Sequence, residues 1–106
     1  MSLVLFEIRD NIALLTLNNP AKRNMLTLEV CEMIVESVAK AEKHPDVKAL
    51  IVTGNGPTFC AGGQLGDITA DKLMLENIYS GFLCIAQSQL PTIAAVNGPA
   101  VGAGFN

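Results

Sequence analysis

The sequence predicts an α/β fold whose elements follow the order β-β-α-β-α-β. Three observations predict it: two β-rich runs at the N-terminus, an apolar stripe of helical period over residues 27–44, and two nearly all-apolar runs at 49–52 and 92–96. Half of the 106 residues are apolar and only 16% are charged, which excludes a disordered tail. No linker or internal repeat interrupts the chain, so we expect residues 1–106 to form a single domain.

The first two strands are predicted to form a hairpin. The runs LVLFEIR (3–9) and IALLTL (12–17) are rich in strand-forming residues and are separated by Asp10 and Asn11. These two residues tolerate the left-handed backbone of a tight turn. The sequence Asn18-Asn19-Pro20 then ends the second strand, because proline lacks an N–H and asparagine favours turns.

An amphipathic helix is predicted after the hairpin. Thr27 is its expected N-cap, and Pro45 disfavours helical geometry at His44 and so should end it. We expect His44 to interact with the helix C-terminus or with solvent rather than to bind a ligand. Charged residues lie between the apolar residues of the stripe, which are Val30, Ile34, Val38 and Ala41.

A buried strand, a second helix and another buried strand should follow. The run ALIV (49–52) has the continuous apolar pattern of a strand that is covered on both faces, and so does TIAAV (92–96). Between them, apolar residues recur at near-helical spacing in a helix that we expect to extend through Gln89. These residues are Leu73, Ile78, Phe82, Ile85 and Ala86.

Composition excludes several classes of function. The net charge of -3, with scattered Lys and Arg residues, gives no field for binding nucleic acid. No apolar stretch is long enough to span a membrane, and the N-terminus lacks the features of a signal peptide. We therefore expect no membrane partner and a cytoplasmic protein, or one of the mitochondrial or peroxisomal matrix. The three cysteines are unevenly spaced, which predicts reduced thiols and no metal site: Cys31, Cys60 and Cys84.

Two glycine-rich loops are the candidate functional site. TGNGPTFCAGG (53–63) follows one buried strand and NGPAVGAGFN (97–106) follows the other, so the loops meet at one edge of the sheet if those strands are neighbours. Such loops can aim two backbone N–H groups at one oxygen, the arrangement of an oxyanion hole. No G-K-[ST] sequence is present, which disfavours a phosphate-binding loop. From spacing alone, a glycine turn that only permits tight packing is an equally good interpretation.

Three segments together resemble the crotonase family of enoyl-CoA hydratases and isomerases. They are NNPAKRNMLT, VKALIVTGNGPTFCAGG and LPTIAAVNGPAVGAGF, and they occur in order along the whole chain. The resemblance implies the β-β-α spiral of the ClpP/crotonase fold. It also implies that the chain is the N-terminal part of such a domain, truncated at the second oxyanion-hole helix, and that the full-length form is a homotrimer or hexamer.

The resemblance also implies the site residues. An acyl-CoA thioester would place its carbonyl between the backbone N–H groups of Gly63 and Ala103, which stabilise an enolate. Coenzyme A is then part of the substrate, and no separate cofactor is expected. Lys22 and Arg23 would approach the CoA phosphates, although a solvated loop is the alternative interpretation. The implied walls of the substrate site are Asn24, Met25, Leu26, Ala61, Gln64, Leu65 and Ile68.

Two positions depart from the family pattern. Gln64 stands where Asp is common, beside the first oxyanion donor. Asn106 stands at the position of the catalytic Glu of the hydratases, and an amide cannot take or give a proton at neutral pH. The sequence therefore favours isomerase-like or other enolate chemistry over hydration. The alternative is a non-catalytic piece that binds acyl-CoA or mediates oligomerisation. Cys60 has no base near it in sequence and is expected to be a small packed residue.

Overall fold

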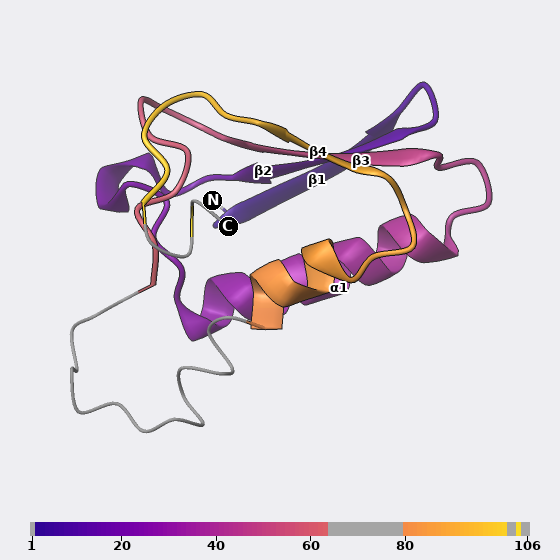
Figure 1. Cartoon of the computed structure of the whole chain (residues 1–106), viewed down its shortest axis with the longest axis horizontal. Coiled ribbons are helices and arrows are strands. Elements are labelled where there is room, and N and C mark those ends of the chain that lie inside the picture. The colour runs from indigo at the N-terminus through magenta and orange to yellow at the C-terminus, as the bar shows by residue number, and fades with distance from the viewer. Residues whose placement is uncertain (1, 64–79, 102–103, 105–106) are drawn as a thin grey trace.

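A four-stranded sheet with helices on one face forms the molecule (Figure 1). The computed structural model describes residues 2–63, 80–101 and 104. The strands lie in the order β1-β2-β3-β4; β1 and β2 are antiparallel, whereas β2–β3 and β3–β4 are parallel. The predicted β-β-α-β-α-β order is confirmed. The strand bounds are Val4–Arg9 for β1, Ile12–Leu17 for β2, Ala49–Gly54 for β3 and Thr92–Ala95 for β4.

The predicted hairpin forms as expected. Asp10 and Asn11 have φ values of 49° and 68°, and they join strands in which Arg9 pairs with Ile12 and Val4 pairs with Leu17. Positive φ at two successive turn residues matches the right-handed twist of the strands.

The helix α1 spans Leu28–Lys43. The Thr27 hydroxyl accepts a hydrogen bond from the Val30 N–H at 3.2 Å, so Thr27 is the N-cap that the sequence predicts. His44 has left the helical conformation, with ψ at 120°, directly before Pro45. All four residues of the predicted apolar stripe are buried: Val30, Ile34, Val38 and Ala41.

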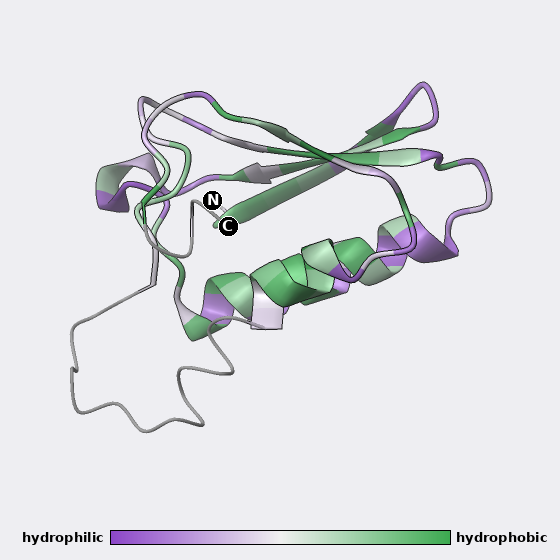
Figure 2. Ribbon diagram, in the orientation of Figure 1, coloured by the Kyte–Doolittle hydropathy of each residue, from purple (hydrophilic) through white to green (hydrophobic). Residues whose placement is uncertain are grey.

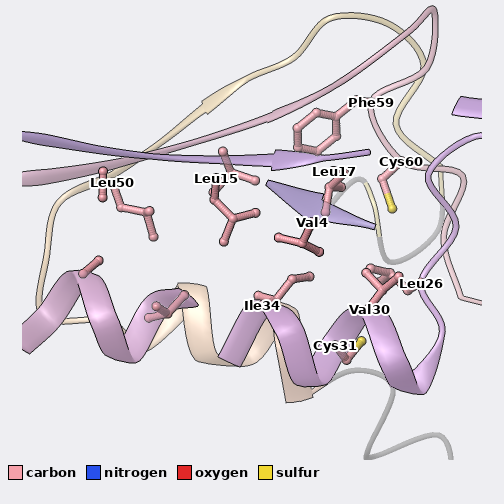
Figure 3. Close-up of a cluster of buried hydrophobic side chains, with 14 of the residues drawn as sticks. Val4, Leu15, Leu17, Leu26, Val30, Cys31, Ile34, Leu50, Phe59 and Cys60 are labelled. Carbon is pink, nitrogen blue, oxygen red and sulfur yellow. The ribbon is translucent and has the colours of Figure 1, made fainter. Parts of the chain in front are cut away.

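The core lies between α1 and one face of the sheet (Figures 2 and 3). Leu15 on β2 pairs with Val52 on β3, and Ala13 pairs with Leu50, so these four side chains share the face that meets the helix. This alternation explains why every second residue of β2 is buried.

Residues 80–86 form a helical segment beside α1 (Figure 1). A Cβ built on Gly81 would lie 3.1 Å from the Cα of Cys31, so the two helices approach closely at this glycine. The sequence predicts that this helix extends through Gln89, but it ends at Ala86. Ser88 Oγ and the Gln89 N–H both donate to the Glu42 carboxylate on α1 instead, at 3.1 Å each.

The sequence predicts that β3 and β4 are covered on both faces, and the described residues do not provide that cover. On β3 only Leu50 and Val52 are buried, and on β4 every residue is exposed, with Ile93 at 55%. The described helices cover the sheet from one side, and β4 is its edge strand. A cavity of about 560 Å³ borders β4 and the 80–86 segment, with an apolar lining that includes Phe82 and Ile85. None of the described helices has the length and apolar character needed to cross a bilayer.

Candidate functional site

The two glycine-rich loops lie at the same edge of the sheet. They leave the carboxyl ends of β3 and β4, which are adjacent parallel strands, and Figure 1 shows both loops at the left end of the molecule. The short 3-10 helix η1 (Pro20–Lys22), from the segment before α1, lies at this same end. The two loops therefore meet, as the sequence predicts for the case in which the two preceding strands are neighbours.

Backbone hydrogen bonds join the 54–63 loop to the segment before α1. The Leu26 N–H donates to the Gly62 carbonyl at 2.8 Å, and the Ala61 N–H donates to the Arg23 carbonyl at 3.0 Å. Leu26 and Gly63 form a parallel bridge. These contacts place Gly63 beside the segment that the family resemblance links to coenzyme A.

The same loop is joined on its other side to the loop after β4. The Phe59 N–H donates to the Pro99 carbonyl at 3.0 Å, and the Val101 N–H donates to the Cys60 carbonyl at 3.0 Å. Cys60 and Ala100 form a second parallel bridge. The 54–63 loop thus lies between the segment before α1 and the loop after β4, and it is hydrogen-bonded to both.

The Gly63 N–H is not used by these contacts. The bridge to Leu26 has its hydrogen bond at the Gly62 carbonyl, and Gly62 turns the backbone with a φ of 95°. Among the hydrogen bonds of the described residues, none has the Gly63 N–H as donor. Gly63 is half-buried, and an N–H group to which no described residue offers an acceptor is suited to bind a ligand oxygen.

The residues assigned to the coenzyme A side differ in exposure. Lys22 and Arg23 are exposed, and within the described part of the chain neither forms an ion pair. Met25 and Ala61 are half-buried. These positions are compatible with a ligand at the loop surface.

Two of the predicted wall residues have buried side chains. Leu26 is fully buried in the core, and Asn24 is 2% exposed with its amide hydrogen-bonded within the loops. Both side chains pack inside the protein, beneath the loops. Their contact with a substrate stays a prediction. The other predicted site residues lie outside the described residues: Gln64, Leu65, Ile68, Ala103 and Asn106.

The cysteines near the loops are packed thiols. Cys60 is fully buried, and burial raises the pKa of its thiol, an effect that a hydrogen bond with the backbone of Gly62 partly opposes. Burial likewise raises the pKa of Cys31 to about 11, against a hydrogen bond with Gly81 that lowers it. A thiol that resists ionisation is a poor nucleophile, so the expectation of a small packed residue at Cys60 is confirmed.

Sequence reasoning missed the side-chain amides that join the loops. Asn97 accepts a hydrogen bond from the Gly54 N–H at 3.1 Å and donates to the Gly56 carbonyl at 2.8 Å. Asn55 donates to Asn18 at 2.8 Å. The only available signal is the presence of asparagines next to glycine or proline turns, which does not say which backbone groups they bind.

Comparisons with known proteins agree with this geometry. Residues 7–106 match the family model described as enoyl-CoA hydratase/isomerase. The probable enoyl-CoA hydratase EchA14 of Mycobacterium tuberculosis is 43% identical over 110 residues, which cover 97% of this chain and 42% of that protein. The 1,2-epoxyphenylacetyl-CoA isomerase of Escherichia coli is 31% identical over 113 residues, covering 98% of this chain and 43% of the isomerase.

A solved structure extends the similarity to three dimensions. The enoyl-CoA hydratase/isomerase from Xanthobacter autotrophicus Py2 aligns with a TM-score of 0.88 and 31% identity, over 97% of this chain and 41% of its own. The chain thus has a crotonase-type fold and spans about two fifths of the length of the relatives it matches.

Proposed function

The chain belongs to the enoyl-CoA hydratase/isomerase family, and on that premise we propose that it binds an acyl-CoA thioester and polarises its carbonyl with two backbone N–H groups. The observation that carries the proposal is the Gly63 N–H, which has no acceptor among the described residues and belongs to a loop that is bonded to the loop after β4. Gly63 is the first donor and Ala103 the second.

The two donors would act on charge that develops at the thioester oxygen. When a proton leaves the carbon next to the carbonyl, negative charge moves to that oxygen, and donors already in place stabilise it without reorganisation. Loss of one such donor typically reduces turnover by about 100- to 1,000-fold. The proton acceptor is assigned to no residue of this chain.

The segment before α1 is proposed to hold the coenzyme A part of the substrate. Lys22 and Arg23 are exposed beside the loop that carries Gly63, where their charges would attract phosphates. Met25 and Ala61, which are half-buried, would form the near wall, with Gln64, Leu65 and Ile68 completing it.

Isomerisation or other enolate chemistry is preferred to hydration. Asn106 stands where a hydratase needs a carboxylate, and an amide neither takes nor gives a proton at neutral pH. We expect the purified protein, in its longest expressed form, to leave crotonyl-CoA unhydrated. Hydration of crotonyl-CoA at ordinary enzyme rates would contradict this preference.

A non-catalytic role in acyl-CoA binding or oligomerisation is the second candidate, because Asn106 stands where the hydratases have a catalytic carboxylate. Binding of a thioester without turnover would favour it. The trimer or hexamer and the cytoplasmic location remain predictions from the sequence.

Isothermal titration with three ligands tests the proposed function: an acyl-CoA thioester, the S-alkyl-CoA thioether of the same chain length, and free CoA. The thioether lacks only the carbonyl oxygen. Two hydrogen bonds of ordinary strength predict that the thioester binds about 5- to 150-fold more tightly than the thioether. Equal affinities for the two would overturn the oxyanion-hole assignment, and absence of binding by all three would overturn the proposed function as a whole.

A further inference from the structure

The carbonyl oxygen of Thr58 is held by two asparagine side chains from opposite sides of the middle loop. Asn24, from the segment before α1, donates to it through Nδ2 at 2.9 Å. Asn97, from the loop after β4, donates to it through Nδ2 at 3.2 Å. A carbonyl has two lone pairs, so these two bonds complete its capacity as an acceptor.

Each asparagine also binds a second part of the loops. Asn24 Oδ1 accepts from the Asn19 N–H at 2.7 Å, and its Nδ2 also donates to the Asn55 carbonyl at 3.1 Å. Asn97 Oδ1 accepts from the Gly54 N–H, and its Nδ2 also donates to the Gly56 carbonyl. All the polar groups of both side chains are therefore engaged in loop-to-loop contacts.

Thr58 lies directly before the backbone bonds that align the three segments. Phe59 and Cys60 bind the loop after β4, and Ala61 and Gly62 bind the segment before α1. A displacement of Thr58 would move this five-residue strip, which ends at Gly63, relative to both neighbours. The two amides therefore bind the middle loop at the residue from which this strip begins.

We propose that Asn24 and Asn97 are positioning residues that meet at the shared Thr58 carbonyl: Asn97 sets the separation between the two carbonyl-binding loops, and Asn24 holds the middle loop against the segment before α1. The proposal rests on the proposed function, because the separation matters chemically only if Gly63 and Ala103 bind one oxygen. Neither side chain needs to touch the substrate. Their effect reaches it through the loop backbone.

The test uses Asn97→Asp, because Asn97 is exposed and its replacement leaves the core intact. The substitution keeps an oxygen for the Gly54 N–H but replaces the donor with a carboxylate oxygen that faces the Gly56 and Thr58 carbonyls. Asn55→Asp is the matched control, since it adds the same charge to the same loop and removes a side-chain donor to Asn18, while the backbone carbonyls of Asn55 and Thr58 that Asn24 binds are unchanged. Asn97→Ala is a second variant that carries no added charge.

The first measurement is amide hydrogen exchange in the ligand-free protein. We expect the Phe59 and Val101 amides, which join the loops, to exchange about 3- to 10-fold faster in both Asn97 variants than in the wild type or in Asn55→Asp. Amides of the β1–β2 hairpin should be unchanged. Unchanged exchange at Phe59 and Val101 would overturn the positioning role.

The second measurement compares thioester and thioether binding in the same variants. Misplaced donors should reduce the preference for the thioester by about 3- to 10-fold while thioether affinity stays constant, and the carbonyl stretch of a ¹³C-labelled thioester should shift toward its frequency in water. Equal weakening of both ligands would mean a merely structural role and would overturn the proposal. If the wild type itself shows no thioester preference, the proposed function fails and the link to the substrate fails with it, whereas the exchange rates still decide whether the amides fix the loops.

Discussion

Gly98 lies where the loop after β4 touches the loop after β3. A Cβ at this position would overlap the carbonyl oxygen of Pro57 and lie 2.8 Å from the carbonyl carbon of the same residue. Pro57 precedes Thr58, whose carbonyl Asn24 and Asn97 share. The contact distance between the loops therefore depends on the absence of one side chain.

We expect Gly98→Ala to separate the loops and to lower the free energy of unfolding by about 1–3 kcal/mol, because backbone atoms rather than a flexible side chain must move. Urea unfolding followed by circular dichroism measures the change. Gly81→Ala is the control: its Cβ would meet Cys31 at 3.1 Å, away from the loops, and alanine favours the helix. A smaller loss in Gly98→Ala than in Gly81→Ala would contradict the structure.

The buried thiol of Cys31 makes the free energy of unfolding decrease at alkaline pH. Burial raises the pKa of this thiol from 9.0 to about 11, whereas the unfolded chain would ionise it near 9.0. Below pH 9 both states keep the proton and the stability is complete. Between pH 9 and 11 only the unfolded state loses the proton, so the free energy of unfolding falls as the pH rises.

The loss attributable to Cys31 should be at most about 3 kcal/mol, since each pKa unit corresponds to about 1.4 kcal/mol. Urea unfolding at several pH values from 8 to 11 checks it, with Cys31→Ala as the comparison. The variant will be less stable throughout but should show a shallower decline with pH. Parallel declines in the two proteins would mean that other groups cause the dependence.

At the scale of elements, α1 depends on a single capping side chain. The Thr27 hydroxyl satisfies the Val30 N–H at the first turn of the helix, and this helix provides one side of the core. We expect Thr27→Ala to cost about 1 kcal/mol of unfolding free energy and Thr27→Ser to cost much less, because serine keeps the hydroxyl. Thermal unfolding measures both. An equal loss in the two variants would argue that the methyl group, not the cap, is the important part.

The local elements are predictable from sequence because their signals are local. The Asp10-Asn11 turn, the Thr27 cap and the Pro45 stop each act through neighbouring backbone atoms, and the structure confirms all three. Whether β4 is covered or exposed could not be predicted in this way. An apolar run indicates that a strand can be buried, but whether another element covers Ile93 is decided by segments elsewhere in the chain.

In the candidate site, too, the features with local signals could be predicted from the sequence and the tertiary contacts could not. Glycine-rich loops after two parallel strands predict that the loops converge, and they do. The contacts of Asn24 and Asn97 with Thr58 could not be predicted, because they join residues far apart in sequence whose backbone positions are fixed only by the fold. Asparagine in a loop is common, and its partners are set by tertiary structure.

At the scale of the whole molecule, the described structure has a packed core on one side of the sheet and exposed apolar surface at the edge strand β4. The core between α1 and the sheet is packed, whereas β4 and the adjoining cavity of about 560 Å³ leave apolar surface exposed. Relatives that contain this region are more than twice as long, since it makes up 42% of the hydratase and 43% of the isomerase.

The decisive measurement is a titration of the ¹⁵N-labelled protein with an acyl-CoA thioester and with its thioether, followed through the amide resonances. If the thioester carbonyl is bound between the loops, the amide protons of Gly63 and Ala103 should move downfield with the thioester and stay in place with the thioether. Resonances of residues 22–26 should respond to both ligands. Shifts at Gly63 and Ala103 that are equal for the two ligands, or absent while binding occurs elsewhere, would contradict the oxyanion hole.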